Sequence, residues 1–230
     1  MIIAEKKIRA IEIDILKCFY CPVPKNGSTS FKHLNFFLNY NQMFKDTKIS
    51  EIIHIHTLYP SQRYMKPYNS LQAHFKLNFL NYHSLFTTRD PIERFISGFN
   101  DRVLFHNKLE LNYSSNFDKL NFFFDNFDKL LLENMDINWH FATQHSFLDI
   151  YKKRYKKITF IKLNQIREYL LNNTKGLLKN RVVKFYDNEE YYFNSSKSRK
   201  IHSQIKIEDL NDEQKHFINI FYKKDFSLNL

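Results

Sequence analysis

Glycine and proline are scarce in this chain, which has only 3 Gly and 5 Pro among 230 residues. The composition is 43% hydrophobic and 17% aromatic, so it excludes intrinsic disorder and is typical of a globular protein. The sequence contains no internal repeat and no linker that would divide it. We therefore expect a single domain over residues 1–230, long enough to bury a substantial core.

Cysteine is nearly absent, since Cys18 and Cys21 are the only two. Their C-x-x-C spacing occurs in redox pairs and in half of a metal site, but no second such pair follows at ligand spacing. Residues three apart on a strand also point to opposite faces, which argues against pairing. We expect two buried thiols in a reducing compartment and no metal site.

Long apolar runs are also missing, because no stretch of eighteen apolar residues occurs anywhere. The first 14 residues carry charges throughout and lack the apolar core of a signal peptide. These features predict a cytoplasmic protein without an integral membrane segment. Peripheral association with a membrane stays open.

Acidic residues are outnumbered, with 24 Asp and Glu against 35 Lys and Arg, for a net charge of +11. This excess favours an anionic partner, which could be a nucleotide, a nucleic acid, an acidic glycan or a membrane surface. A basic nucleic-acid-binding protein should show a basic helix or an RNA-binding motif, whereas lysine is scattered along the whole chain. Nucleic acid is therefore the less favoured partner.

The chain is organised around a predicted strand, loop and helix at residues 15–38. An apolar run predicts a buried strand over 15–23, and apolar residues recur at helical spacing after the loop PKNGSTS. Pro24 ends the strand, Gly27 permits a tight turn, and the serines and threonine that follow suit a helix start. Such a unit aims backbone N–H groups and a helix dipole at one point, which suits a phosphate or sulfate group. An ordinary strand–turn–helix with one exposed lysine is the alternative.

Predicted strands and helices alternate along the rest of the chain. Residues 11–14 suggest extended chain that runs into the first strand. Apolar, β-branched runs predict further strands over 51–58, 82–88 and 157–163. Helical spacing predicts helices over 70–80, 91–105, 117–134, 164–173 and 210–226. This alternation indicates an α/β fold with a central parallel sheet.

A second candidate anion site begins at Arg89, which would lie at the carboxyl end of a strand, where open α/β sheets bind ligands. Asp90 and Pro91 suit the N-cap and first position of the helix that follows. Ser97 lies a little over two helical turns further on and can share a face with the groups before the helix. The rigid fork of arginine binds phosphate oxygens bidentately. A capped helix with an Arg–Glu surface pair is the alternative.

Two histidines, His54 and His56, project to the same face of the strand predicted over 51–58. An imidazole can accept a hydroxyl proton because its unperturbed pKa is near neutrality. A metal pair or two structural histidines are the alternatives. Metal is the weakest of these, because no carboxylate or third histidine follows at ligand spacing.

The two anion motifs together resemble those of sulfotransferases that use 3′-phosphoadenosine-5′-phosphosulfate (PAPS). The loop Pro-Lys-x-Gly-Ser-Thr-Ser resembles their 5′-phosphosulfate loop, and the fuller stretch YCPVPK resembles carbohydrate sulfotransferases of the chondroitin and uronyl 2-O-sulfotransferase group. The segment RDPIERFIS matches the 3′-phosphate motif R-[DN]-P-x-x-R-x-x-S. The resemblance assigns the 3′-phosphate to Arg89 and Ser97, and the 5′-phosphosulfate to Lys25, Asn26, Gly27, Ser28, Thr29 and Ser30.

Further segments are similar to the same family at their expected places. The resemblance makes His56 the catalytic base and His54 its neighbour. The segment FNSSKSRKIHSQ lies where the family has its final cofactor loop, with Ser196, Arg199 and Lys200 as candidates. The ending FYKKDFSL matches a common Tyr-x-x-Asp-Phe pattern. The family segment H-W-x-P-Q is altered here, with Trp139 before His140 and no proline before Gln144.

The resemblance implies a three-layer α/β/α fold like that of P-loop nucleotide kinases. It implies a PAPS-dependent carbohydrate O-sulfotransferase that needs no metal and acts on a polysaccharide or a glycolipid. A small-molecule kinase would share the fold. It should carry a Walker lysine after its second glycine and a Mg²⁺-binding carboxylate after a strand, and neither is apparent.

Overall fold

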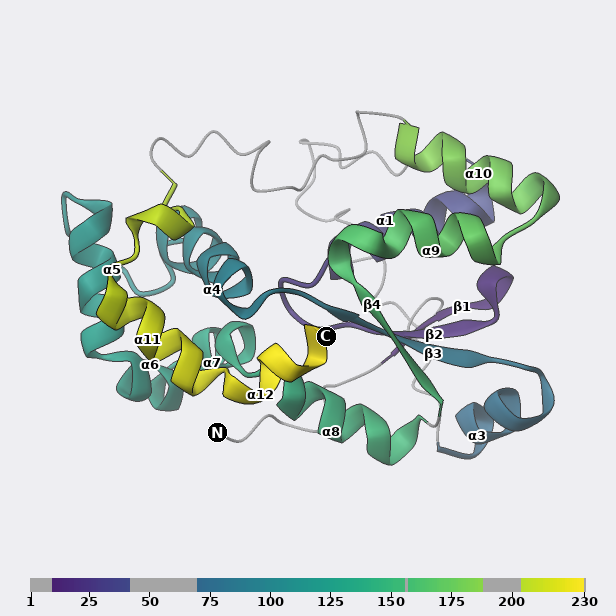
Figure 1. Cartoon of the computed structure of the whole chain (residues 1–230), viewed down its shortest axis with the longest axis horizontal. Coiled ribbons are helices and arrows are strands. Elements are labelled where there is room, and N and C mark those ends of the chain that lie inside the picture. The colour runs from purple at the N-terminus through teal and green to yellow at the C-terminus, as the bar shows by residue number, and fades with distance from the viewer. Residues whose placement is uncertain (1–9, 42–69, 156, 188–203, 230) are drawn as a thin grey trace. The chain divides into compact units, whose positions relative to one another are not determined.

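The computed structural model describes residues 10–41, 70–155, 157–187 and 204–229 (Figure 1). The contacts between residues group the chain into two compact units. The sheet unit comprises the described residues of 10–88 and 148–187, and the helical unit comprises those of 89–147 and 204–229. The expected single domain stays a prediction.

The sheet unit contains a four-stranded sheet in the order β1-β2-β3-β4. Its strands are β1 (Ile11–Ile13), β2 (Cys18–Cys21), β3 (His83–Thr88) and β4 (Ile158–Lys162). The last three are parallel to one another, but β1 runs antiparallel to β2. The sheet is therefore mixed, and the prediction of a parallel sheet was wrong for β1. The strand predicted over 51–58 lies outside the described residues.

Strand β1 is antiparallel because the chain reverses direction before β2. Asp14–Leu16 form the 3₁₀ turn η2, and Lys17 then adopts a left-handed φ of 48° while its N–H donates to the Asp14 carbonyl at 2.9 Å. We had expected one extended segment here. The alternating pattern of residues 11–14 does not reveal this reversal, because a left-handed lysine is uncommon.

Helices cover both faces of this sheet (Figure 1). Helices α1 (Ser28–Tyr40), α9 (Ile166–Asn173) and α10 (Gly176–Asp187) lie over one face, where Tyr20 stacks on Phe31 with ring centroids 3.8 Å apart. The other face packs on α8 (Gln144–Arg154), whose Tyr151 ring meets the Phe86 ring edge-on. All four residues of β2 are buried, as expected for a strand covered on both sides. Helix α3 (Ser70–Phe79) precedes β3, and the turn η4 (Leu163–Gln165) follows β4.

Both cysteines of β2 are buried free thiols, as predicted. Cys18 belongs to the cluster beneath α1, and burial raises the pKa of Cys18 and of Cys21. Both thiols therefore stay protonated at neutral pH. Within the described ranges, no group of three or more His, Cys, Asp and Glu side chains could hold a metal ion.

The helical unit is built around an aromatic core. Rings of Phe95, Phe123, Phe127 and Phe141 pack together, with centroids 4.8–6.2 Å apart. They come from α4 (Pro91–Phe99), α5 (Asn116–Asp125), α6 (Phe127–Glu133) and α7 (Met135–Phe141). The described residues of this unit also form the π-helical segment η3 (Asn100–Phe105), α11 (Asp212–Phe221) and α12 (Lys223–Phe226), with short turns η6 (Ile207–Asp209) and η7 (Ser227–Asn229).

Local hydrogen bonds explain where these helices differ from the predicted ones. The helix predicted over 117–134 is broken at Asn126, whose side-chain amide donates to the Phe122 carbonyl at 2.9 Å. Helix α7 was not predicted, although Asn134 caps it by accepting from the N–H groups of Asp136 and Ile137. Helices α8 and α10 were missed as well. The helices predicted over 70–80 and 164–173 and the strands over 82–88 and 157–163 are confirmed.

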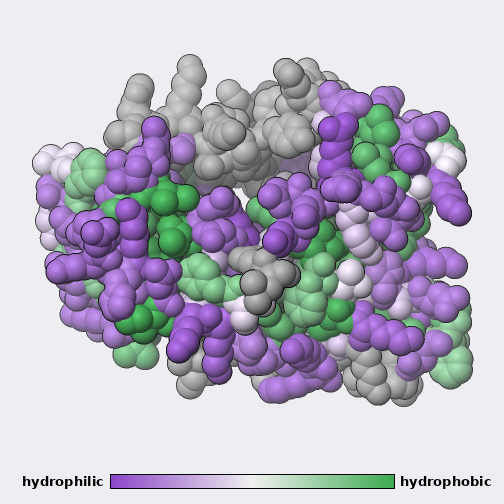
Figure 2. Space-filling view, in the orientation of Figure 1, coloured by the Kyte–Doolittle hydropathy of each residue, from purple (hydrophilic) through white to green (hydrophobic). Residues whose placement is uncertain are grey.

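The surface drawn in Figure 2 is mostly hydrophilic, including the stretch over α11. Asp212, Glu213 and Asn219 are exposed on that helix, while Ile218 is buried. None of the helices in the described part of the chain is long and apolar enough to cross a membrane.

Candidate functional site

The loop of residues 24–30 turns the chain from β2 into α1. Lys25 and Gly27 both adopt left-handed backbone conformations, with φ of 68° and 81°. Gly27 is the N-cap of α1, and a Cβ built on it would lie 2.6 Å from Leu163 Cδ1. Glycine is favoured here both by its backbone angle and by the close approach of a neighbouring side chain. The predicted strand–loop–helix is confirmed.

Asn26 anchors this loop to the end of β3. Its fully buried side-chain amide donates to the Thr87 carbonyl at 2.7 Å. Its own carbonyl accepts from the Tyr20 hydroxyl at 3.1 Å and from the Thr87 hydroxyl at 2.8 Å. These bonds fix the backbone that directly follows the half-buried Lys25. The loop conformation is thus set by strands β2 and β3.

Helix α1 begins with an electropositive first turn. Its N-cap is Gly27, so no side chain caps it, and its first turn contains no acidic residue. The first N–H groups of a helix have no intrahelical acceptor, and the helix dipole is positive at this end. The turn therefore suits an anion held close to Ser28–Ser30.

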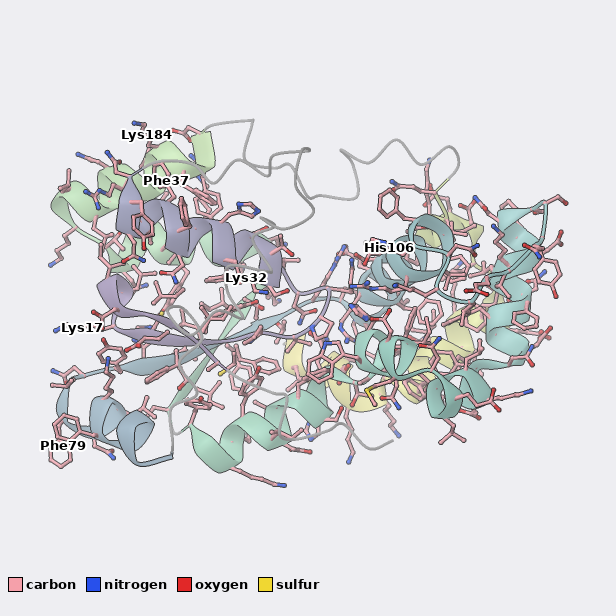
Figure 3. The ribbon with its side chains drawn as sticks, turned by 180° about the vertical axis from the view of Figure 1, so that it is seen from behind. Lys17, Lys32, Phe37, Phe79, His106 and Lys184 are labelled. Atoms are coloured by element: carbon pink, nitrogen blue, oxygen red, sulfur yellow. The ribbon has the colours of Figure 1, made fainter. Side chains whose placement is uncertain are left out.

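Lys32 is a buried cation one turn into α1 that the sequence analysis did not single out. Only 9% of its surface is exposed, and burial lowers its pKa from 10.5 to about 8. Figure 3 shows Lys32 in the N-terminal half of α1, with Phe37 further along the same helix. The sequence alone does not reveal that this lysine is buried, because a single lysine directly after Phe31 does not disturb the helical spacing of the apolar residues.

The burial of Lys32 predicts a pH-dependent difference between variants. Because the folded pKa lies below the unfolded one, holding the proton costs stability below about pH 8, and this cost disappears as pH rises to 10.5. The stability of Lys32→Met relative to wild type should therefore fall by up to about 3 kcal/mol between pH 7 and 10.5. Urea unfolding at several pH values measures this. Lys32→Arg, which keeps its charge, should lose stability relative to wild type over the same range, and a constant difference for both variants would contradict the buried charge.

The Arg89 segment begins α4 as predicted. Asp90 is the N-cap, and its carboxylate accepts from the N–H groups of Ile92 and Glu93 at 2.9 and 3.0 Å, with Pro91 in the first turn. The Arg89 side chain is 23% exposed, and its Nε lies 3.3 Å from Glu93 Oε2. Ser97 is half-buried near the end of α4. The capped helix and the Arg–Glu pair are therefore both present, and the Arg89 side chain stays partly exposed beside the exposed Glu93.

Gln144 holds the backbone of Arg89. Its Oε1 accepts from the Arg89 N–H at 2.9 Å, and its Nε2 donates to the Arg89 carbonyl at 2.8 Å. The Asp225 carboxylate accepts in turn from the N–H groups of Gln144 and His145 at 2.7 and 2.8 Å. Burial raises the pKa of Asp225, and these two N–H groups and Arg94 oppose that rise. The altered H-W-x-P-Q segment and the Tyr-x-x-Asp-Phe ending were the only sequence signals of this network.

Arg94, the second arginine of the motif, lies inside the helical unit. It is 1% exposed, and its guanidinium donates to the His140 carbonyl at 3.2 Å and lies 5.9 Å from the centre of the Tyr222 ring. Burial lowers its pKa, while Tyr222 and Asp225 oppose this. Tyr222 donates to the Phe141 carbonyl at 2.6 Å. Arg94 therefore lies in the interior of the helical unit, and Arg89 remains as the accessible arginine of the motif.

The other predicted site residues lie outside the described part of the chain. These are the two candidate bases, His54 and His56, and the candidates of the final loop, Ser196, Arg199 and Lys200. Among the residues that are described, Lys25 to Ser30 belong to the sheet unit, whereas Arg89 and Ser97 belong to the helical unit.

Comparison with known proteins identifies the family. A model of the sulfotransferase family matches residues 14–228, a span that includes the 24–30 loop, the Arg89 segment and the closing Tyr-x-x-Asp-Phe pattern. No curated protein and no solved structure shows a significant similarity to the chain. The family match covers nearly the whole sequence and agrees with an α/β structure. The chain belongs to the sulfotransferase family.

Proposed function

We propose that this enzyme transfers the sulfuryl group of PAPS to a hydroxyl group of a carbohydrate. The observation that carries the proposal is the 24–30 loop, which joins Lys25 to an uncapped helix start without acidic residues. In a sulfotransferase, such a loop suits the 5′-phosphosulfate of the donor. The mixed sheet with helices on both faces supports a three-layer arrangement like that of P-loop nucleotide kinases.

The donor would be held by groups from separate parts of the chain. Lys25 and the backbone N–H groups up to Ser30 would bind the 5′-phosphosulfate. Arg89 and Ser97 would bind the 3′-phosphate, for which the accessible fork of Arg89 is suited. The final loop, with Ser196, Arg199 and Lys200, would close over the 3′-phosphate and adenine. The structure adds one constraint, because the Asn26 side-chain amide donates to the Thr87 carbonyl and its backbone N–H donates to the Val23 carbonyl at 3.1 Å. Asn26 would therefore shape the loop, and the groups that follow it would contact the donor.

The reaction would be an in-line displacement at sulfur. The acceptor hydroxyl oxygen attacks sulfur, the bond from sulfur to the bridging phosphate oxygen breaks, and adenosine 3′,5′-bisphosphate leaves. His56 takes the hydroxyl proton, with His54 beside it, while Lys25 neutralises the leaving oxygen. A positively charged or N–H group aimed at the developing charge in this way contributes about 3–4 kcal/mol to stabilisation of the transition state. The proposed step uses no metal ion.

The proposed acceptor is a polysaccharide or a glycolipid. The stretch from Tyr20 to Lys25 supports a carbohydrate, and a net charge of +11 suits an acidic glycan. Two free buried thiols suit a reducing, cytoplasmic environment, with peripheral membrane association for a lipid-linked acceptor.

Nucleotide discrimination tests the donor. Wild type should bind adenosine 3′,5′-bisphosphate more tightly than adenosine 5′-monophosphate, and Arg89→Ala should lose about 10- to 100-fold of that preference, since it removes charged hydrogen bonds to one phosphate. Titration calorimetry with both nucleotides gives the ratio. Arg167→Ala is the matched control, because Arg167 is also partly exposed and paired with an acidic residue, Asp187. Equal affinity of wild type for PAPS and for adenosine 5′-phosphosulfate would remove the reason for assigning Arg89 and Ser97 to the 3′-phosphate.

A further inference from the structure

The backbone of Arg89 lies in a gap between two regular elements. Strand β3 ends at Thr88 and helix α4 begins at Pro91, so neither a strand ladder nor a helix supplies both partners to the Arg89 peptide groups. Gln144 fills this role with one side chain, accepting from the N–H at 2.9 Å and donating to the carbonyl at 2.8 Å. An amide that bonds both groups of one residue fixes its backbone and therefore the direction of its Cα–Cβ bond.

Gln144 is itself buried and held by a hydrogen bond to Asp225. Its side chain is 0% exposed, and its N–H donates to the Asp225 carboxylate, which also accepts from the His145 N–H. Asp225 is 0% exposed as well and comes from α12, 81 residues further along the chain. Burying a carboxylate is costly unless it is paired and hydrogen-bonded, and here two N–H groups and the nearby Arg94 stabilise it. Asp225 thus holds the backbone of Gln144, and the Gln144 side chain holds the backbone of the accessible Arg89.

We propose that Gln144, fixed by Asp225, is a positioning residue that aims the Arg89 guanidinium at the 3′-phosphate of the sulfuryl donor. The inference rests on the proposed function. Arginine has a flexible side chain, and binding a phosphate restricts it. If the backbone is already held before binding, less conformational entropy is lost when the phosphate binds, and the guanidinium stays within reach of the phosphate. The affinity for ligands without a 3′-phosphate should not depend on Gln144.

The test is the ratio of affinities for adenosine 3′,5′-bisphosphate and adenosine 5′-monophosphate, measured by titration calorimetry on the full chain. Gln144→Met keeps the size of the side chain and removes both bonds to Arg89. It should reduce the ratio by about tenfold, while affinity for the monophosphate stays unchanged. Gln144→Glu keeps the acceptor for the Arg89 N–H and should recover part of the ratio. It also serves as the test if the methionine variant does not fold.

Gln214→Met is the matched control in the same unit. Gln214 is also a buried glutamine at a helix start, and its amide donates to Asn121 Oδ1 at 3.0 Å without touching Arg89. This variant should lower the melting temperature and leave the affinity ratio as in wild type. The proposal is overturned if both Gln144 variants keep the full ratio, or if they weaken both nucleotides equally. A wild type that shows no 3′-phosphate preference would instead refute the proposed function.

Discussion

Lys25→Ala is expected to abolish measurable sulfuryl transfer, with a loss of about 10²- to 10³-fold or more in kcat and weaker donor binding. The leaving phosphate oxygen gains negative charge as its bond to sulfur breaks, and the variant removes the cation proposed to neutralise it. The loop itself should persist, because Asn26 and Gly27 hold its backbone through bonds and packing that do not involve the lysine side chain. Transfer of label from ³⁵S-labelled PAPS to a glycan mixture measures the loss.

Lys17→Ala is the matched control for this experiment. Lys17, labelled in Figure 3, is another lysine of the sheet unit with a left-handed backbone, at φ 48°. It precedes β2, whereas Lys25 follows that strand. Both substitutions place alanine in the same strained conformation, so they share the cost to folding. Only Lys25→Ala should stop transfer. Near-normal turnover in that variant would show that the loop does not hold the phosphosulfate.

His56→Ala is expected to lower kcat by roughly 10²- to 10⁴-fold, the usual range for loss of a general base, with PAPS affinity nearly unchanged. This prediction rests on the sequence, in which His56 follows His54 toward the carboxyl end of a predicted strand, where ligands bind. His54→Ala should cost less, because that residue would orient its neighbour. The wild-type rate should fall as pH drops through the imidazole pKa, since a protonated base accepts no proton.

His83→Ala provides the comparison for a histidine on a described strand. His83 lies on β3, and its Nε2 is 3.1 Å from the Tyr169 hydroxyl. We expect this variant to keep its turnover. A larger loss for His54→Ala than for His56→Ala would exchange the two roles. If neither variant slows transfer, the base lies elsewhere, and His33 and His140 are the next residues to substitute.

The sequence was sufficient for the features that depend on neighbouring residues. The loop after β2 and the capped start of α4 were both predicted, because proline, glycine and N-cap residues act on the backbone within a few positions. The buried character of β2 and the two free thiols followed from an unbroken apolar run. The motif that begins at Arg89 was recognisable for the same reason, since its residues lie on one helix and its approach.

Contacts between distant segments were decided only by the tertiary structure. The sequence assigned the 3′-phosphate to Arg89 and gave Arg94 no role, and only the packing shows that Arg94 is buried against Tyr222 while Arg89 stays accessible. Gln144 contacts Arg89, 55 residues earlier in the chain, and Asp225, 81 residues later, so no local spacing predicts either contact. A side chain's solvation and partners depend on which elements pack around it, and local periodicity carries no information about that choice.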